Sequence, residues 1–320
     1  MDLPVYTELS NFSVRKSGKK VTTDLSIVLI INRESDPVDS INSIYNFISK
    51  TKYKTEFLLI NRDKEGYKYD KLLSTFQIMR VLLPQDKISL VSAINLVVTE
   101  SLSKHILFTN EFSQIQSVDD EIIDMYLSES TYGAIIPLML NPRDEVIPNI
   151  VKGGASRGFI NTISRDIVGS AVSSIYPKYF CFILNKDAII SREINLNEYR
   201  DEQYVLLDLG YQLWKEGFVI LQVRNFKMVY QNEPKNDIMQ NYQSEDYLAF
   251  NFNNLTSDNT LKERNKKIIR IILGFIFTFR FKNLIALFRL LKESKNTAQK
   301  NSLKPVEDSA IFSIINKDLK

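Results

Sequence analysis

The sequence has one cysteine, Cys181, and one histidine, His105, in a chain of 320 residues. A single cysteine excludes an internal disulfide and any metal site built from several cysteines. A single histidine excludes histidine-rich zinc sites and disfavours a catalytic triad that depends on histidine. Glycine is also scarce, with ten residues, which excludes glycine-rich low-complexity sequence. We interpret Cys181, in an apolar segment, and His105, at the start of another, as structural residues.

Signals for export and for membrane spanning are missing as well. The first residues, MDLPVYTELSNF, lack a basic region followed by an apolar run, so no secretory signal is predicted. In the apolar C-terminal part, the longest stretch without a charge is 271–279, nine residues, whereas a membrane span needs roughly 20. We therefore expect a protein of the reducing cytosol.

The charges are distributed unevenly. Hydrophobic residues make up 44% and charged residues 25%, as in ordinary globular proteins, which excludes global disorder. The net charge is +3, but residues 261–295 hold ten Lys and Arg against two Glu, a local net charge of +8. The rest of the chain therefore carries −5. An acidic body with a basic C-terminal segment argues against a nucleic-acid binder and for one local anionic partner, such as a membrane surface.

The first half of the chain alternates strands and helices. Residues 25–31 form a continuous apolar run typical of a strand buried on both faces, and 39–50 has helical spacing. A second strand at 55–60 then implies a parallel pair with a crossover helix. The same pattern predicts strands at 77–83, 105–109 and 132–140, and helices at 89–102 and 117–128. Functional sites in such doubly wound sheets lie beyond the C-terminal ends of the strands.

The pattern changes after residue 140. Residues 141–158 are rich in turn formers and predict a flexible loop. Residues 179–189 read as a strand that enters a turn, and 208–217 as a short helix capped by Gly217. Two further strands are expected, at 218–223 and 226–230. The polar N-terminal residues 1–23, with basic residues at 15, 16, 19 and 20, are expected to be a loose lead-in.

Over about residues 24–232 the sequence resembles a family-2-type inverting glycosyltransferase with the GT-A nucleotide-sugar fold. The resemblance rests on the order and spacing of eight segments. They are LSIVLIINRESDPVDSINSI, EFLLINRDKEG, SAINLVV, HILFTNEF, YGAIIPLMLNPRDEVI, YFCFILNKDAI, YRDEQYVLLDLGYQLWKEGFVI and FKMVYQ. It implies a mixed sheet with helices on both faces, followed here by C-terminal amphipathic helices.

The resemblance also implies a chemistry from which this sequence departs. The family uses a carboxylate pair for a divalent metal, a carboxylate base for the acceptor hydroxyl, and an acid that grips the nucleoside. Here the second strand ends in Asn61 instead of Asp, and the D-x-D position reads Asn110-Glu111-Phe112. Counted back from Gly217, the E-D pair falls on Val205-Leu206, so that only Asp208 survives, and the terminal His is Gln231. Asn keeps a polar side chain but lacks the charge that binds Mg²⁺ or Mn²⁺.

Two outcomes follow from these replacements. Either nearby acids have taken over the chemistry, or the site is inactive and the domain binds a partner or a sugar. The acids available for the first outcome are Glu34, Asp63, Glu111, Glu202 and Asp208. Asp208 is the expected base and Glu202 the second choice, and Glu111 is the expected metal ligand if Mg²⁺ or Mn²⁺ is used. The residues expected on the donor side are Asn32, Glu34, Asn61, Asp63, Asn95 and Asn110.

Each of these residues also has a structural interpretation. Asn61 and Asn110 end strands, where Asn is a common turn residue. For Glu111 the structural interpretation, a solvated loop acid, is favoured over a metal ligand, and Asp208 is favoured as the cap of a helix that it begins. Asn95 lies mid-helix among apolar residues, which is costly for an amide without a partner and favours a polar task.

The basic segment 261–295 is the other informative feature. On an ideal helix, apolar residues of this segment share one arc, and the basic residues lie on the opposite side. The arc consists of Ile268, Ile269, Ile272, Phe275, Ile276, Phe279, Leu287 and Leu290. This pattern is typical of a helix that lies in the membrane interface, and helices that pack on their own domain or on a dimer partner are the alternative. Gly274 and Asn283 are expected to divide the segment into two helices, and the polar tail after Lys295 is expected to be mobile.

We therefore expect four parts: a lead-in at 1–23, a GT-A domain at 24–260, the amphipathic segment at 261–295 and a polar tail at 296–320. The first hypothesis is an enzyme at the inner face of the cell membrane. It would move a hexose or deoxyhexose from a nucleotide-sugar donor to a lipid-linked or surface-glycan acceptor. The second is a catalytically inactive relative that acts as a scaffold for an active glycosyltransferase, or that pairs with a second copy.

Overall fold

The computed structural model describes residues 3–10, 23–32, 37–63, 69–76, 79–156, 159–166, 169–232, 237–238, 244–256, 258–277, 281–302 and 304–317. The strands are β1 (Tyr6–Ser10), β2 (Leu25–Ile31), β3 (Thr55–Asn61), β4 (Met79–Pro84), β5 (His105–Asn110), β6 (Ser113–Val118), β7 (Tyr132–Leu140), β8 (Ile150–Ser156), β9 (Phe159–Arg165), β10 (Ala171–Ser173), β11 (Phe182–Asn185) and β12 (Val219–Tyr230). The helices are α1 (Val38–Lys50), α2 (Tyr69–Thr75), α3 (Leu90–Glu100), α4 (Asp120–Ser128), α5 (Lys186–Ile190), α6 (Glu202–Lys215), α7 (Glu245–Asn254), α8 (Asp258–Phe277), α9 (Phe281–Ser302) and α10 (Asp308–Ile315).

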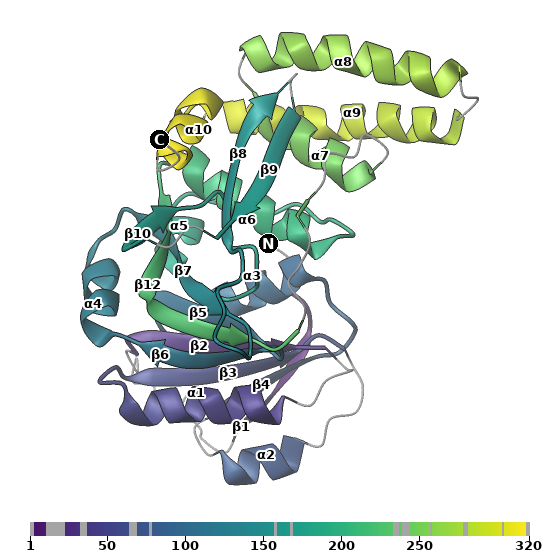
Figure 1. The fold of residues 1–320 in the computed structure, drawn as a ribbon. Coiled ribbons are helices and arrows are strands. Elements are labelled where there is room, and N and C mark those ends of the chain that lie inside the picture. The colour runs from purple at the N-terminus through teal and green to yellow at the C-terminus, as the bar shows by residue number, and fades with distance from the viewer. Residues whose placement is uncertain are drawn as a thin grey trace.

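One large mixed sheet organises the molecule (Figure 1). Its order is β1-β4-β3-β2-β5-β11-β7-β12-β10, with β6 on β12, and the hairpin β8-β9 stands apart. Strands β4, β3, β2 and β5 are parallel, whereas β11 runs antiparallel between β5 and β7. The predicted α/β architecture is therefore confirmed.

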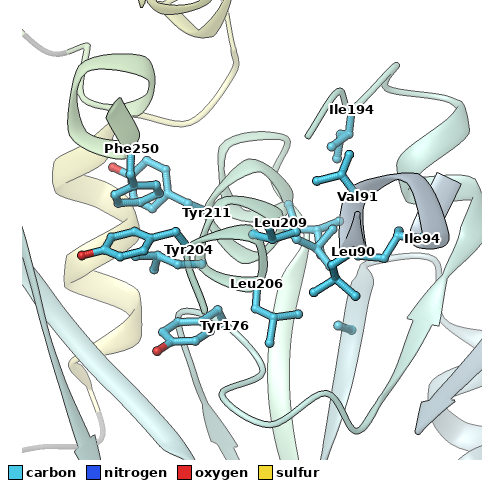
Figure 2. Packing of buried hydrophobic residues seen from close by; sticks show 14 of the residues in the cluster. Leu90, Val91, Ile94, Tyr176, Ile194, Tyr204, Leu206, Leu209, Tyr211 and Phe250 are labelled. Atoms are coloured by element: carbon cyan, nitrogen blue, oxygen red, sulfur yellow. The ribbon is translucent and has the colours of Figure 1, made fainter. Parts of the chain in front are cut away.

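Helices cover both faces of this sheet. All seven residues of β2 are buried, because successive side chains point to opposite faces and both faces are covered. Val28 and Ile30 belong to the core that contains α3 and α6, and Leu29 belongs to the core that contains Ile41 and Ile44 of α1. Figure 2 shows the first core, where Leu206 and Leu209 of α6 face Leu90, Val91 and Ile94 of α3.

Glycines shape α6 at two places. A Cβ on Gly210 would lie 2.3 Å from the carbonyl oxygen of Ile175, so only glycine lets α6 approach that segment so closely. Gly217 follows the helix with a φ of +86°, which agrees with its predicted role at the C-terminus of the helix. The helix itself begins earlier than predicted, at Glu202, and covers fourteen residues.

Two segments predicted to be irregular are strands. Residues 6–10 form β1, which pairs antiparallel with β4 and brings Glu8 to within 3.1 Å of Arg80. The basic residues of the predicted lead-in lie outside the described residues. The predicted loop at 141–158 is also wrong in its second half, because β8 pairs with β9 from Ile150 to Ser156. At position 153 of β8 only glycine fits without a shift, because a Cβ on Gly153 would lie 2.4 Å from the carbonyl oxygen of Asn161.

The C-terminal part differs most from expectation. Two helices form as predicted, but the break between them is elsewhere. Helix α8 ends at Phe277 and α9 begins at Phe281, so Gly274 lies inside α8 and Asn283 inside α9. The prediction of a mobile polar tail after Lys295 is wrong as well, since α9 continues to Ser302 and Ile311 and Ile315 of α10 are completely buried. Figure 1 shows α8 lying along α9, with α7 on the other side of α9.

The predicted apolar arc of 261–295 divides between two environments. Ile268, Phe275 and Leu287 are buried, so this part packs within the protein. Ile269 and Ile276 are exposed instead, and Phe279 lies outside the described residues. The exposed apolar surface of the α8–α9 hairpin therefore includes only two residues of the arc, Ile269 and Ile276, together with four residues outside it: Leu273, Phe277, Ile285 and Phe288.

Candidate functional site

Three parallel strands end side by side at one edge of the sheet. Ile31 pairs with Asn61 across β2 and β3, and Ile30 pairs with Asn110 across β2 and β5. The residues that follow these strands therefore gather at the carboxyl edge, as the sequence predicted for Asn32, Asn61 and Asn110. In open α/β sheets this edge is where ligands bind. We refer to these three strand ends as the β2/β3/β5 edge.

Glu111 joins two of the strand ends. Its Oε1 accepts a hydrogen bond from the backbone N–H of Asn32 at 3.2 Å, and its carbonyl oxygen accepts from Ser40 Oγ of α1 at 2.9 Å. Glu111 is 9% exposed, whereas Asn32 is exposed. The carboxylate therefore fixes the backbone of the edge and is not a solvated loop acid.

Asn110 acts as a turn residue. Its Oδ1 accepts from the backbone N–H of Phe112 at 3.0 Å and from Ser113 Oγ at 2.8 Å. These bonds turn the chain from β5 into β6, a strand that the sequence analysis missed. The structural interpretation of Asn110 is thus the one that its contacts support.

Asn61 is also used within its own loop. Its Nδ2 donates to Tyr69 OH at 2.6 Å, and its Oδ1 accepts from the backbone N–H of Asp63 at 3.0 Å. Asp63 forms an ion pair with Lys87 at 2.9 Å. The polar groups at the end of β3 are therefore tied to one another and to the loop before α3.

Arg62 is a residue at this edge to which the sequence assigned no role. Its N–H donates to Ile31 O at 3.1 Å, its carbonyl accepts from Ile88 N at 3.1 Å, and its Nε donates to Ile88 O at 3.3 Å. Its Nη1 forms an ion pair with Glu202, and the two side chains are 9% and 46% exposed. A basic residue directly after a buried strand was the signal available in the sequence.

The ion pair brings the beginning of α6 to the same edge. Asp201 caps this helix by accepting from the N–H of Gln203 at 2.9 Å, and Glu202 is its first residue. The expectation that Asp208 begins the helix is therefore wrong. Glu202, the second choice for the base, lies beside the strand ends, and Asp208 lies about two turns further along.

Asp208 is fully buried and surrounded by hydrogen-bond donors. Its Oδ2 accepts from the N–H and the Nδ2 of Asn197 at 3.0 and 2.9 Å. Its Oδ1 accepts from Asn254 Nδ2 at 2.8 Å and from Gln212 Nε2 at 3.5 Å. Burial raises the pKa of Asp208 above its ordinary value, and these hydrogen bonds act in the opposite direction. This setting favours a packing role over contact with an acceptor.

Two other residues were expected on the donor side, Asn95 and Glu34. Asn95 is half-buried in α3, and its carbonyl accepts from Thr99 Oγ1 at 2.9 Å. Glu34 lies outside the described residues. Within the described ranges, no group of three or more His, Cys, Asp or Glu side chains could hold a metal ion.

Comparisons with known proteins address the fold. No family model and no curated protein matches the sequence. Among solved structures, GalNAc-T7 with UDP, GalNAc and Mn²⁺ is similar over 94% of this chain, with a TM-score of 0.64 and 13% identity. Residues 1–349 of TarS from S. aureus are similar over 92% of this chain and 91% of that one, with a TM-score of 0.51 and 10% identity.

The chain has the GT-A fold. The expectation from the resemblance is thereby confirmed at the level of architecture, while identities of 10–13% show the fold alone. The alignment spans 58% of the GalNAc-T7 chain. In the part of the chain that the structure describes, no helix combines the length and apolar character needed to cross a bilayer.

Proposed function

We propose that this chain transfers a sugar from a nucleotide-sugar donor to an acceptor hydroxyl. The observation that carries the proposal is the gathering of three polar strand ends at one edge of a GT-A sheet. A solved neighbour with the same fold holds UDP and GalNAc, which supports a nucleotide-sugar ligand here. The donor would lie over the β2/β3/β5 edge. Asn32, which is exposed there, is the residue best placed to meet it.

Glu202 is the carboxylate that we assign as general base. It begins α6 beside the strand ends and is 46% exposed on its side chain, so an acceptor can reach it. In the family-2-like, inverting reaction, the acceptor oxygen attacks the anomeric carbon while the bond to the diphosphate breaks. The electron pair leaves with the nucleoside diphosphate, and the acceptor proton passes to the Glu202 carboxylate. Asp208, with no exposed surface, supports α6 from within.

The acceptor is proposed to be a lipid-linked or surface glycan presented at a membrane face. The support comes from the α8–α9 hairpin, where Phe277 and Phe288 are 77% and 53% exposed. Ile269, Leu273, Ile276 and Phe277 follow helical spacing and form one face. Exposed basic residues accompany them at Lys266, Arg270, Lys282, Arg289 and Lys292. Apolar residues beside cations suit the interface of an anionic bilayer.

A titration of nucleotide sugars tests the central proposal. UDP-, GDP-, CDP- and dTDP-sugars would be added with and without Mn²⁺, and both binding and release of nucleoside diphosphate would be measured. We expect at least one donor to bind and to be hydrolysed slowly in the absence of acceptor. Binding without any hydrolysis or transfer would favour the scaffold hypothesis. Failure of every donor to bind would contradict the proposal.

A further inference from the structure

The fold raises the question of how this chain neutralises the diphosphate of a donor. The structure of GalNAc-T7 contains Mn²⁺. Among protein side chains, carboxylates are the main ligands of Mg²⁺ and of ions with similar preferences such as Mn²⁺. The described carboxylates near the β2/β3/β5 edge each have a partner already: Glu111 accepts from Asn32 N–H, Asp63 pairs with Lys87, and Glu202 pairs with Arg62.

The neutral residue at the metal position does not compensate for this shortage. The Asn110 Oδ1 accepts two hydrogen bonds, at 3.0 and 2.8 Å, that hold the turn into β6. Its use as a metal ligand would break that turn. The residues described at this edge therefore do not fit a divalent ion held in the manner of a carboxylate pair.

Arg62 is a fixed cation at the same edge. Its backbone is hydrogen-bonded on one side to Ile31 and on the other to Ile88, and its Nε is held by Ile88 O at 3.3 Å. The side chain is 9% exposed, so solvent screens its charge less than that of a surface arginine. A guanidinium group carries a delocalised positive charge and matches the geometry of a phosphate through parallel N–H donors.

The partner of Arg62 is the part of the pair that can leave. Glu202 is 46% exposed and stands at the first position of α6, from where its side chain can rotate into solvent. A phosphate oxygen offers the guanidinium the same charge-assisted hydrogen bonds as the carboxylate does. Exchange of one anion for the other would also release Glu202.

We infer that the Arg62 guanidinium is the counter-charge for the donor diphosphate in this chain, in place of a divalent metal, and that Glu202 occupies it until the donor binds. The inference rests on the proposed function. Donor binding then frees the Glu202 carboxylate to take the acceptor proton, so the donor binds before the acceptor. The negative charge that leaves with the nucleoside diphosphate develops beside Arg62.

Titrations of UDP, GDP and CDP into the full chain test this inference, each in EDTA and again in Mn²⁺. We expect the affinity for the best diphosphate to change little on adding EDTA. Arg62→Gln should weaken it by about tenfold or more, whereas Arg62→Lys should restore part of the loss because it keeps a charge. Glu202→Gln should bind the diphosphate at least as tightly as the wild type, because the competing anion is gone.

Arg200→Gln is the matched control, since Arg200 is 83% exposed and pairs with Glu245 instead. It should bind as the wild type does. Thermal melting of each variant separates a binding defect from a folding defect, and Glu202→Gln tests the exchange even if Arg62→Gln is unstable. Binding that requires Mn²⁺, or that is unchanged in a folded Arg62→Gln, would overturn the inference and leave the proposed function standing. No binding of any donor by the wild type would overturn both.

Discussion

The buried carboxylate of Asp208 connects three segments of the chain. Its acceptor oxygens are shared by Asn197 of the loop before α6, Gln212 of α6 and Asn254 of α7. Gln212 extends the network, because its Nε2 also donates to Asn254 Oδ1 at 2.8 Å. A buried acceptor group surrounded by donors is costly to remove, since the donors are then left without acceptors.

We expect Asp208→Ala to destabilise the fold by roughly 2–4 kcal/mol, because several buried donors lose their acceptor at once. Asp208→Asn should also be destabilising, since one carboxylate oxygen becomes an NH₂ group that faces other donors. Chemical denaturation measures both changes. Unchanged stability together with complete loss of transfer would contradict the packing role and restore Asp208 as the base.

The buried side chain of His105 leads to a prediction about how stability depends on pH. Burial first and the charge of Lys104 second together lower its pKa to about 4, while Asp187 opposes the change. The folded pKa lies below the ordinary value of about 6.5. The folded state therefore favours neutral His105, and its contribution to stability is complete above pH 6.5 and is lost as the pH falls toward 4 and below.

The wild type should accordingly lose up to roughly 3 kcal/mol between pH 6.5 and 4 through this residue. His105→Gln carries no such charge, so its stability should fall less over the same range. Denaturation curves of the two proteins at matched pH provide the comparison. Parallel losses in both would mean that His105 does not titrate in this window.

Single residues were the least predictable level. The sequence indicated that polar groups follow β2, β3 and β5, because strand periodicity defines where strands end. It could not show that Asn110 completes a turn, that Asp208 lies two turns inside α6, or that Arg62 meets Glu202. The last contact joins residues 140 positions apart, and only the packing of α6 on the sheet edge creates it.

The secondary-structure elements followed the sequence where burial is strong. Strand β2 and strand β7 have the bounds that were predicted, because apolar runs with turn residues at both ends leave few alternatives. Strands β8 and β9 were missed, since they form a separate two-stranded sheet that is only partly buried, and β8 contains two glycines. The C-terminal helix α10 was missed because its apolar residues follow a long polar stretch.

The exposed apolar residues of the α8–α9 hairpin lead to a prediction about membrane binding. Double substitution of Phe277 and Phe288 by Ser removes two exposed rings without touching the buried Phe275 and Leu287. Burial of each ring in a bilayer interface contributes of the order of 1 kcal/mol or more. We therefore expect binding to vesicles of mixed neutral and anionic lipid to fall by at least tenfold.

Sedimentation with vesicles measures this binding, and the matched control replaces Met125, an exposed residue of α4 distant in sequence, by Ser. The control should bind as the wild type does. Equal binding by the double variant and the wild type would rule out the hairpin as the membrane surface. A switch from dimer to monomer in the double variant would instead assign the hairpin to a second copy of the chain.

At the scale of the whole molecule, the sheet and helix α6 determine which residues meet at the β2/β3/β5 edge. The sheet gathers the strand ends, and α6 brings Glu202 to them. The α/β architecture was accessible from the order of strands and helices, and the GT-A form of it was what the resemblance implied. The roles of the residues at the strand ends were not accessible, since the acids that the resemblance implies are replaced and contacts such as that of Arg62 with Glu202 arise only in the folded chain.

Hydrogen–deuterium exchange with the best-binding nucleotide sugar tests most directly whether the β2/β3/β5 edge is the donor site. We expect bound donor to slow exchange in peptides that end strands β2, β3 and β5 and in the first turn of α6. Exchange in the β8–β9 hairpin and in α10 should not change. Protection confined to other segments, with the three strand ends unaffected by a nucleotide that demonstrably binds, would contradict the account.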